Sequence, residues 1–205
     1  MDKTLARYRE FKKNFKFDFK QIEKNENGLF VDGICIEDKN GKNIVFETDT
    51  FINAAYGARV GIARLLSNLF PYQFKFRGKK VASIEGILQG IKYKDIKTQN
   101  LVLNYSGADA YYVRTCNSID FWGDSGILYW QGKEIKRESG EYQLFIDELY
   151  ISALKNPLYK RALLASGNKY ILHHIGRDNP KETVLTRYEL ESTLACLRAF
   201  LISEK

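Results

Sequence analysis

The sequence predicts an α+β fold: a single, predominantly α-helical domain with peripheral β-hairpins. Three observations lead to this prediction. The chain has 205 residues, of which 44% are hydrophobic, and that length supports one domain with its own core. Apolar residues recur at helical spacing in several long segments, whereas two short β-like regions centre on the dipeptides Asn40-Gly41 and Gln131-Gly132. No repeat, low-complexity stretch or Pro/Ser-rich linker divides the chain, so residues 1–205 are expected to form one domain.

The first predicted elements are a helix and a hairpin. Residues 1–16 predict an amphipathic helix that docks on the body, because apolar side chains recur at spacings of three and four: Leu5, Tyr8, Phe11 and Phe15. Two β-like runs follow, residues 28–37 and 43–48. The Asn40-Gly41 dipeptide between them tolerates the positive φ angles of a tight turn, so the two runs are expected to pair.

A second hairpin and two helices are predicted further along the chain. Residues 126–135 are β-like and turn at Gln131-Gly132. Residues 141–155 have a helical apolar face, which Asn156-Pro157 interrupts. Since proline fits the first turn of a helix, the next helix is expected to begin there and to stop before Gly167.

The last predicted element is a C-terminal helix. Thr186 and Glu189 have the spacing of a capping box, which marks a helix N-terminus. An apolar stripe follows at helical spacing: Leu190, Leu194, Leu197 and Leu201. We expect this stripe to belong to the hydrophobic core.

Composition limits the classes of partner. The net charge of +7 favours anionic partners, but no block of like charges resembles a nucleic-acid-binding tail, so phosphate-bearing small molecules fit at least as well. The three cysteines include no CxxC pair, so neither a disulfide framework nor a zinc knuckle is predicted. Neither a secretory signal pattern nor an apolar run of about 18 residues is present, so a cytoplasmic protein without a membrane partner is expected.

Glu85 is the most informative single residue. Between Asp49 and Asp95 it is the one acidic residue among eight basic ones: Arg59, Arg64, Lys75, Arg77, Lys79, Lys80, Lys92 and Lys94. A site for a phosphorylated substrate needs this pattern, because cations hold phosphate while a carboxylate faces developing positive charge. The alternative is an ordinary glutamate on a surface helix.

The helix that carries Glu85 is expected to begin at the cap residue Ser83 and to run to about Lys94. At 100° per residue, Glu85, Gln89 and Lys92 lie within about 60° of each other and form a polar stripe. An aliphatic face lies beside this stripe: Ile84, Ile87, Leu88 and Ile91. Glycines at 86 and 90 indicate a close approach by another helix or by a ligand. Helix packing with an ordinary Glu85–Gln89 pair is the alternative to a binding site.

These residues resemble a known family. The segment 66–71 (LSNLFP), Phe74, Gly78 and then Ser83-x-Glu85-x3-Gln89-x2-Lys92-Tyr93 are similar to the signature of the NADAR family of YbiA-like proteins. The resemblance resumes at 161–167 (RALLASG), and continuing without a gap aligns His174 and Asp178 with a family His and Asp. The segment 194–201, with Arg198, resembles the closing helix of the family. Residues 61–203 are thus the expected family core, with 1–60 as an N-terminal elaboration.

Two departures from the family pattern mark a divergent member. The nearest counterpart of the family's Asp-Trp motif is Arg137-x4-Tyr142, with Tyr in place of Trp. The Trp-Gly that follows the family's Asp is replaced by residues 179–183. Four aromatic residues could stack a base, although aromatics at β-like spacing are more often core: Trp122, Tyr129, Trp130 and Tyr142.

The two histidines are neighbours, His173 and His174, after an apolar stretch. Neighbours in an extended segment point to opposite faces, so at most one can share a pocket with Asp178. The family alignment selects His174, and a structural histidine is the alternative. Two histidines without clustered Cys, Asp or Glu do not form a metal site, so no metal is predicted.

The resemblance implies an enzyme, an N-glycosyl hydrolase that needs no cofactor and cleaves the bond between ribose C1 and a base. Such cleavage passes through an oxocarbenium-like state, which one carboxylate can stabilise while another group protonates the leaving base. Glu85 is predicted for the first role and Asp178 for the second. Possible phosphate-holding residues are Arg64, Lys75, Arg77 and Lys92. The predicted substrate-binding set is Asn68, Gln89, Lys92, His174, Arg64, Arg77 and Tyr142.

The implied substrate is a phosphorylated nucleotide-like small molecule or ADP-ribosylated nucleic acid. Examples are ADP-ribosyl-guanine and a ribosylamine intermediate of the riboflavin pathway. The departures from the family motifs support an alternative, a non-catalytic module that binds ADP-ribose, NAD or ADP-ribosylated nucleic acid. General nucleic-acid binding is a third interpretation, based on charge alone.

Overall fold

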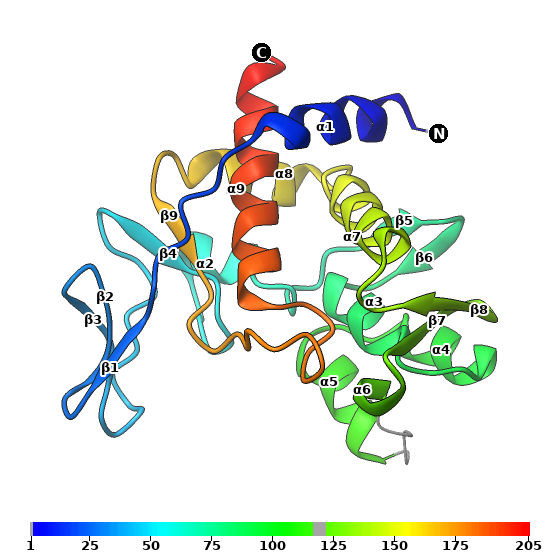
Figure 1. Cartoon of the computed structure of the whole chain (residues 1–205), viewed down its shortest axis with the longest axis horizontal. Coiled ribbons are helices and arrows are strands. Elements are labelled where there is room, and N and C mark those ends of the chain that lie inside the picture. The colour runs from blue at the N-terminus through cyan, green and yellow to red at the C-terminus, as the bar shows by residue number, and fades with distance from the viewer. Residues whose placement is uncertain (1, 117–121) are drawn as a thin grey trace.

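The computed structural model describes residues 2–116 and 122–205 (Figure 1). Helix α9 (Arg187–Ser203) runs through the middle of the molecule, and α1 (Lys3–Asn14) crosses its C-terminal end. Helices α7 (Gly140–Ala153) and α8 (Pro157–Ala165) pack against α9. The predicted α+β fold, mainly helical with small sheets, is confirmed.

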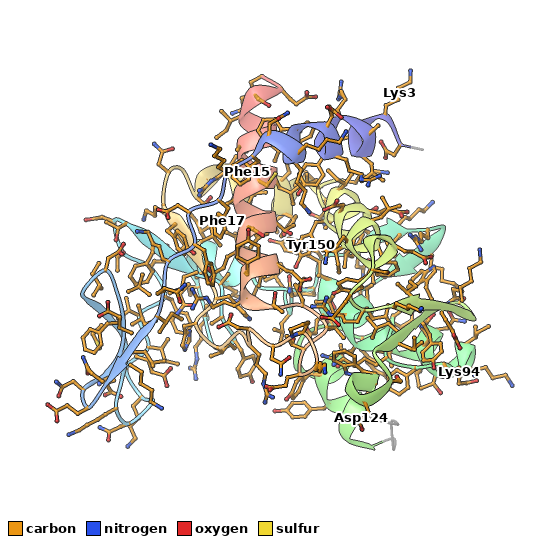
Figure 2. All side chains as sticks on the ribbon, viewed as in Figure 1. Lys3, Phe15, Phe17, Lys94, Asp124 and Tyr150 are labelled. Atoms are coloured by element: carbon orange, nitrogen blue, oxygen red, sulfur yellow. The ribbon has the colours of Figure 1, made fainter. Side chains whose placement is uncertain are left out.

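The predicted N-terminal helix docks on α9 through aromatic side chains. The Tyr8 ring lies 5.6 Å from the Phe200 ring, and Phe11 approaches the same ring at 5.8 Å. The chain then runs alongside α9, where Figure 2 shows Phe15 and Phe17 in succession. Phe17 makes an edge contact with Tyr188 in the first turn of α9, at 5.9 Å between ring centroids. Burial of this aromatic surface fixes the first segment to the body.

The prediction of one strand over residues 28–37 is wrong. This segment is itself a hairpin, formed by β2 (Gly28–Val31) and β3 (Ile34–Asp38), and β1 (Glu23–Asn25) pairs with β2. The physical reason is the turn at Asp32-Gly33, where both residues adopt positive φ, 50° and 76°. A turn does form at Asn40-Gly41, but residues 43–48 then make isolated bridges rather than the predicted second strand.

The second predicted hairpin is confirmed, and a third was not predicted. Strands β7 (Ile127–Trp130) and β8 (Lys133–Lys136) meet at Gln131-Gly132, with φ angles of 49° and 84°. Strands β5 (Phe74–Phe76) and β6 (Lys79–Val81) pair in the same way around Arg77-Gly78, with φ angles of 47° and 83°. Both turns have the backbone of two-residue hairpins.

One parallel strand pair connects the two ends of the chain. Strand β4 (Phe51–Asn53) pairs with β9 (Tyr170–Leu172), so that Ile52 lies beside Ile171. Local patterning gave no signal for this pairing, because the partners are more than a hundred residues apart. The pair places the segment after β4 next to the segment after β9, where the two histidines follow.

The remaining helices are short, and the one that carries Glu85 packs against the two that follow it in the chain. They are α2 (Gly61–Leu66), α3 (Ile84–Gly90), α4 (Ile96–Val102), α5 (Gly107–Cys116) and α6 (Trp122–Ser125). Helix α3 starts after the predicted cap Ser83 but ends at Gly90, earlier than predicted, because Asp95 caps the next helix. The predicted helices at 141–155 and after Asn156, and the capping box at Thr186, are confirmed. No helix in the described part of the chain is long and apolar enough to cross a membrane.

Candidate functional site

Asn68 holds the start of α3 against the centre of the molecule. Its backbone oxygen accepts a hydrogen bond from the Glu85 amide at 2.9 Å, and its Oδ1 accepts one from the Tyr150 hydroxyl at 2.9 Å. Tyr150 belongs to α7 and lies near the middle of the molecule (Figure 2). Ser83 caps α3 by accepting from the Gly86 amide at 2.9 Å. The backbone that carries Glu85 is therefore fixed on both sides.

The polar stripe of α3 forms a hydrogen-bonded chain. Gln89 Nε2 donates to Glu85 Oε1 at 2.6 Å, and Lys92 Nζ donates to Gln89 Oε1 at 2.7 Å. All three residues are buried, and Glu85 is only 9% exposed. Burial raises the pKa of the Glu85 carboxyl, while the Gln89 hydrogen bond and the Lys92 charge act in the opposite direction. Glu85 is thus a desolvated carboxylate with one oxygen held in place.

The two glycines of α3 accommodate a neighbouring segment rather than a ligand. A Cβ atom at Gly86 would lie 2.9 Å from the Tyr105 backbone oxygen and 3.3 Å from that of Val102. At Gly90 it would lie 3.3 Å from a methyl group of Leu103. The close approach predicted from the sequence is therefore made by the end of α4 and the residues that follow it.

Glu85 lines a cavity of about 510 Å³. Its charged, imidazole and amide lining comes from the loop before β5, from α3 and its end, and from the loop after β9: Asn68, Glu85, Gln89, Lys92, His173, Arg177 and Glu182. Three exposed tyrosines, Tyr56, Tyr111 and Tyr112, also line it. A concave site with apolar walls and a few convergent polar groups is typical of small-molecule binding.

The structure places His173, rather than His174, on this cavity. His173 Nδ1 lies 3.1 Å from the Ala54 carbonyl oxygen, so it carries the proton and leaves Nε2 as an acceptor. Burial lowers the pKa of His173 to about 4, which keeps the ring neutral. His174 lies elsewhere: its Nδ1 contacts Asn53 and its Nε2 lies 2.9 Å from Glu37 Oε2.

Helix α9 fixes the loop that carries His173. The fully buried Glu191 carboxylate accepts from the His173 amide at 2.8 Å and lies 3.1 Å from Arg187 Nε. The Arg187 amide donates to the Arg177 carbonyl at 2.9 Å. The orientation of His173 thus depends on two contacts from distant segments, Ala54 and Glu191, and neither has a local signal in the sequence.

The other predicted site residues are dispersed. Asp178 is exposed and is not among the residues that line the cavity. Arg77 pairs with Glu148 at 2.8 Å on the β5–β6 turn, and Tyr142 is fully buried beneath the Arg137 guanidinium. Arg64 lines a second cavity that adjoins the first. Of the predicted set, Asn68, Glu85, Gln89 and Lys92 come together, and the functional roles of all these residues remain predictions.

The fold and this site define a small α+β protein with a carboxylate-bearing cavity between its helices. The family model for bacteriophage protein GP30.3 matches residues 61–199, so the chain belongs to that family. One relative, described as an uncharacterized 17.1 kDa protein in the Gp30-rIII intergenic region of Enterobacteria phage T4, is 31% identical over 135 residues. That alignment covers 65% of this chain and 88% of the phage protein.

The comparison with solved structures finds the NMR structure of the E. coli protein YbiA, at a TM-score of 0.49 and 18% sequence identity. The match covers 77% of this chain and 88% of YbiA. We therefore infer the chemistry of the cavity from the residues that line it and from the sequence motifs.

Proposed function

We propose that the protein is an N-glycosyl hydrolase that cleaves the bond between ribose C1 and a base. The observation that carries the proposal is the buried Glu85 carboxylate, which lines a cavity of about 510 Å³ and is held by Gln89 and Lys92. The spacing of these three residues is also the part of the sequence that resembles the NADAR signature.

In the proposed reaction, the bond between C1 and the base nitrogen breaks and its electron pair goes to the nitrogen. Positive charge then develops at C1, and a carboxylate fixed beside it stabilises that charge most strongly where water is excluded. Burial raises the pKa of Glu85, and the Gln89 hydrogen bond and the Lys92 charge counteract part of this rise. The chain from Lys92 through Gln89 also fixes the orientation of the carboxyl group. The oxygen of the attacking water then bonds to C1, and the free Nε2 of His173 can accept the proton that this water loses.

The predicted proton donor to the leaving base is Asp178, which belongs to the same loop as His173 but is exposed. An Asp178→Asn variant tests this role. We expect slower turnover with little change in substrate affinity, because only the step that expels the base would lose its proton donor. Full turnover by this variant would remove Asp178 from the mechanism.

The proposed substrate is an ADP-ribosylated base or a ribosyl phosphate attached to an amine. The decisive comparison is wild type with Glu85→Gln, using ADP-ribosylated guanosine and a ribosylamine phosphate as substrates. Released ADP-ribose or ribose phosphate is measured by chromatography, and circular dichroism and thermal melts confirm folding. We expect the variant to lose at least about 100-fold in turnover, as enzymes do when an electrostatic stabiliser is removed.

Glu148→Gln is a matched control, since this glutamate is partly exposed, lies on α7 and pairs with Arg77. It should retain turnover. Full turnover by Glu85→Gln would contradict the proposed role of Glu85. If wild type binds ADP-ribose but hydrolyses none of the substrates, the protein is instead a binding module without turnover.

A further inference from the structure

A second cavity, of about 700 Å³, adjoins the Glu85 cavity. The two share Tyr56 and Leu69 in their walls. The polar side chains that line the second cavity include Arg59, Arg64 and Ser67, and we call it the arginine cavity. A ligand that lies over Glu85 can therefore extend past Tyr56 into it.

The charge of the arginine cavity is uncompensated. No carboxylate is among its lining residues, and within residues 2–116 and 122–205 neither Arg59 nor Arg64 forms an ion pair. Most described arginines do pair with a carboxylate: Arg7, Arg9, Arg77, Arg137, Arg177 and Arg187. Two unpaired guanidinium groups on one concave surface create a positive potential that attracts anions.

Arg64 is also held in place without its charge being neutralised. Its Nη1 donates to the Arg59 backbone oxygen at 2.8 Å, and its guanidinium carbon lies 5.5 Å from the centre of the Phe70 ring. A guanidinium group has five N–H donors, so most of them stay available for a ligand. Guanidinium groups bind phosphate through paired hydrogen bonds, and prior orientation reduces the entropy cost of binding.

We propose that the arginine cavity binds the phosphate or diphosphate group of a ligand whose ribose lies over Glu85. This inference rests on the proposed function and deepens it, because it assigns the residues that hold the phosphate of the proposed phosphorylated substrate. Together the two cavities span about 1,200 Å³ before their shared boundary is discounted, which is ample for a nucleotide-sized ligand.

The structure also distinguishes among the basic residues that the sequence offered as phosphate-binding candidates. Arg77 and Lys75 line a different cavity, together with Glu148 and Asp2, so their surroundings contain acidic groups. Lys92 is hydrogen-bonded to Gln89 inside the Glu85 cavity. Arg59 and Arg64 are therefore the phosphate-binding residues in this proposal.

The test is isothermal calorimetry on the full chain carrying Glu85→Gln, which prevents turnover during the titration. The ligands are ADP-ribose, which carries a diphosphate, and adenosine, which carries none. Arg59→Ala and Arg64→Ala are each expected to weaken ADP-ribose binding roughly tenfold, and the double variant further, while adenosine binding stays unchanged. Arg161→Ala is the matched control, because Arg161 is an exposed arginine on α8, outside both cavities.

Unchanged ADP-ribose binding by the double variant would overturn the inference. So would an equal loss for ADP-ribose and adenosine, or a loss caused by Arg77→Ala but not by Arg64→Ala. The proposed function fails in a different way, through absence of hydrolysis by the chain that retains Glu85. If ADP-ribose binding depends on the two arginines but no substrate is hydrolysed, phosphate binding by the arginine cavity is supported and the proposed enzymatic activity is contradicted.

Discussion

Replacing Gly86 by alanine should destabilise the protein, although alanine normally stabilises a helix. In a helix interior the change from glycine gains up to about 1 kcal/mol. At this position the new Cβ would lie 2.9 Å from one backbone oxygen and 3.3 Å from another. Since neither is the end of a flexible side chain, α3 must move away from the segment after α4. Overpacking of this kind costs about 1–3 kcal/mol, so after the gain in helix propensity we expect a net loss of up to about 2 kcal/mol.

Gly140→Ala is the matched comparison. Gly140 is also helical, in the first turn of α7, and a Cβ atom there meets nothing within 4 Å. This variant should be as stable as wild type or slightly more stable. Urea unfolding followed by circular dichroism measures both free energies of unfolding. Equal or greater stability of Gly86→Ala would refute the close packing of α3.

The same substitution should also affect the site, because Gly86 follows Glu85 directly. A shift of α3 moves the carboxylate relative to bound substrate, and a misplacement of about 1 Å can cost on the order of 100-fold in rate. We therefore expect Gly86→Ala to lower turnover while Gly140→Ala does not.

Three further predictions concern titration, a buried ion pair and the ligand. The pKa of His173 is lowered from an ordinary value of 6.5 to about 4, so the unfolded chain takes up the proton first as pH falls. Stability should therefore be lost between pH 6.5 and 4, by up to about 3 kcal/mol relative to His173→Asn, and parallel pH curves in urea unfolding would contradict this. Arg137→Met leaves the Glu189 carboxylate without its 2.5 Å partner and should cost about 3 kcal/mol in free energy of unfolding, whereas a loss under 1 kcal/mol would show that the pair is effectively solvated. ADP-ribose affinity should be unchanged by a chelator and should fall as salt screens the arginine cavity, so loss of binding on chelation would contradict the metal-free assignment.

Elements with local signals could be predicted from the sequence, and those that depend on distant contacts could not. The Thr186 capping box and the Gln131-Gly132 turn are short-range patterns, and both are present. The Asp32-Gly33 turn is also a short-range signal, but it lies inside an apolar run that resembles one strand. The β4–β9 pair joins segments more than a hundred residues apart, and the local pattern of apolar residues does not predict it.

The candidate site shows the same division. Glu85, Gln89 and Lys92 share a helix face, so their proximity follows from helical spacing alone. Strand alternation correctly separated the two histidines, but which of them meets the cavity is decided by the Ala54 carbonyl, which β4 brings alongside. The sequence also ranked Arg64 and Arg77 equally as phosphate-binding residues. In the structure they differ, because Glu148, which is distant in the sequence, forms an ion pair with Arg77.

The most direct test of the account is a crystal structure of Glu85→Gln with ADP-ribose. We expect ribose C1 to lie roughly 3–4 Å from the side chain at position 85, the distance from which a group can act on a reacting atom. The diphosphate should contact Arg59 and Arg64. A ribose outside the Glu85 cavity, with C1 facing solvent or another surface, would contradict the proposed role of Glu85.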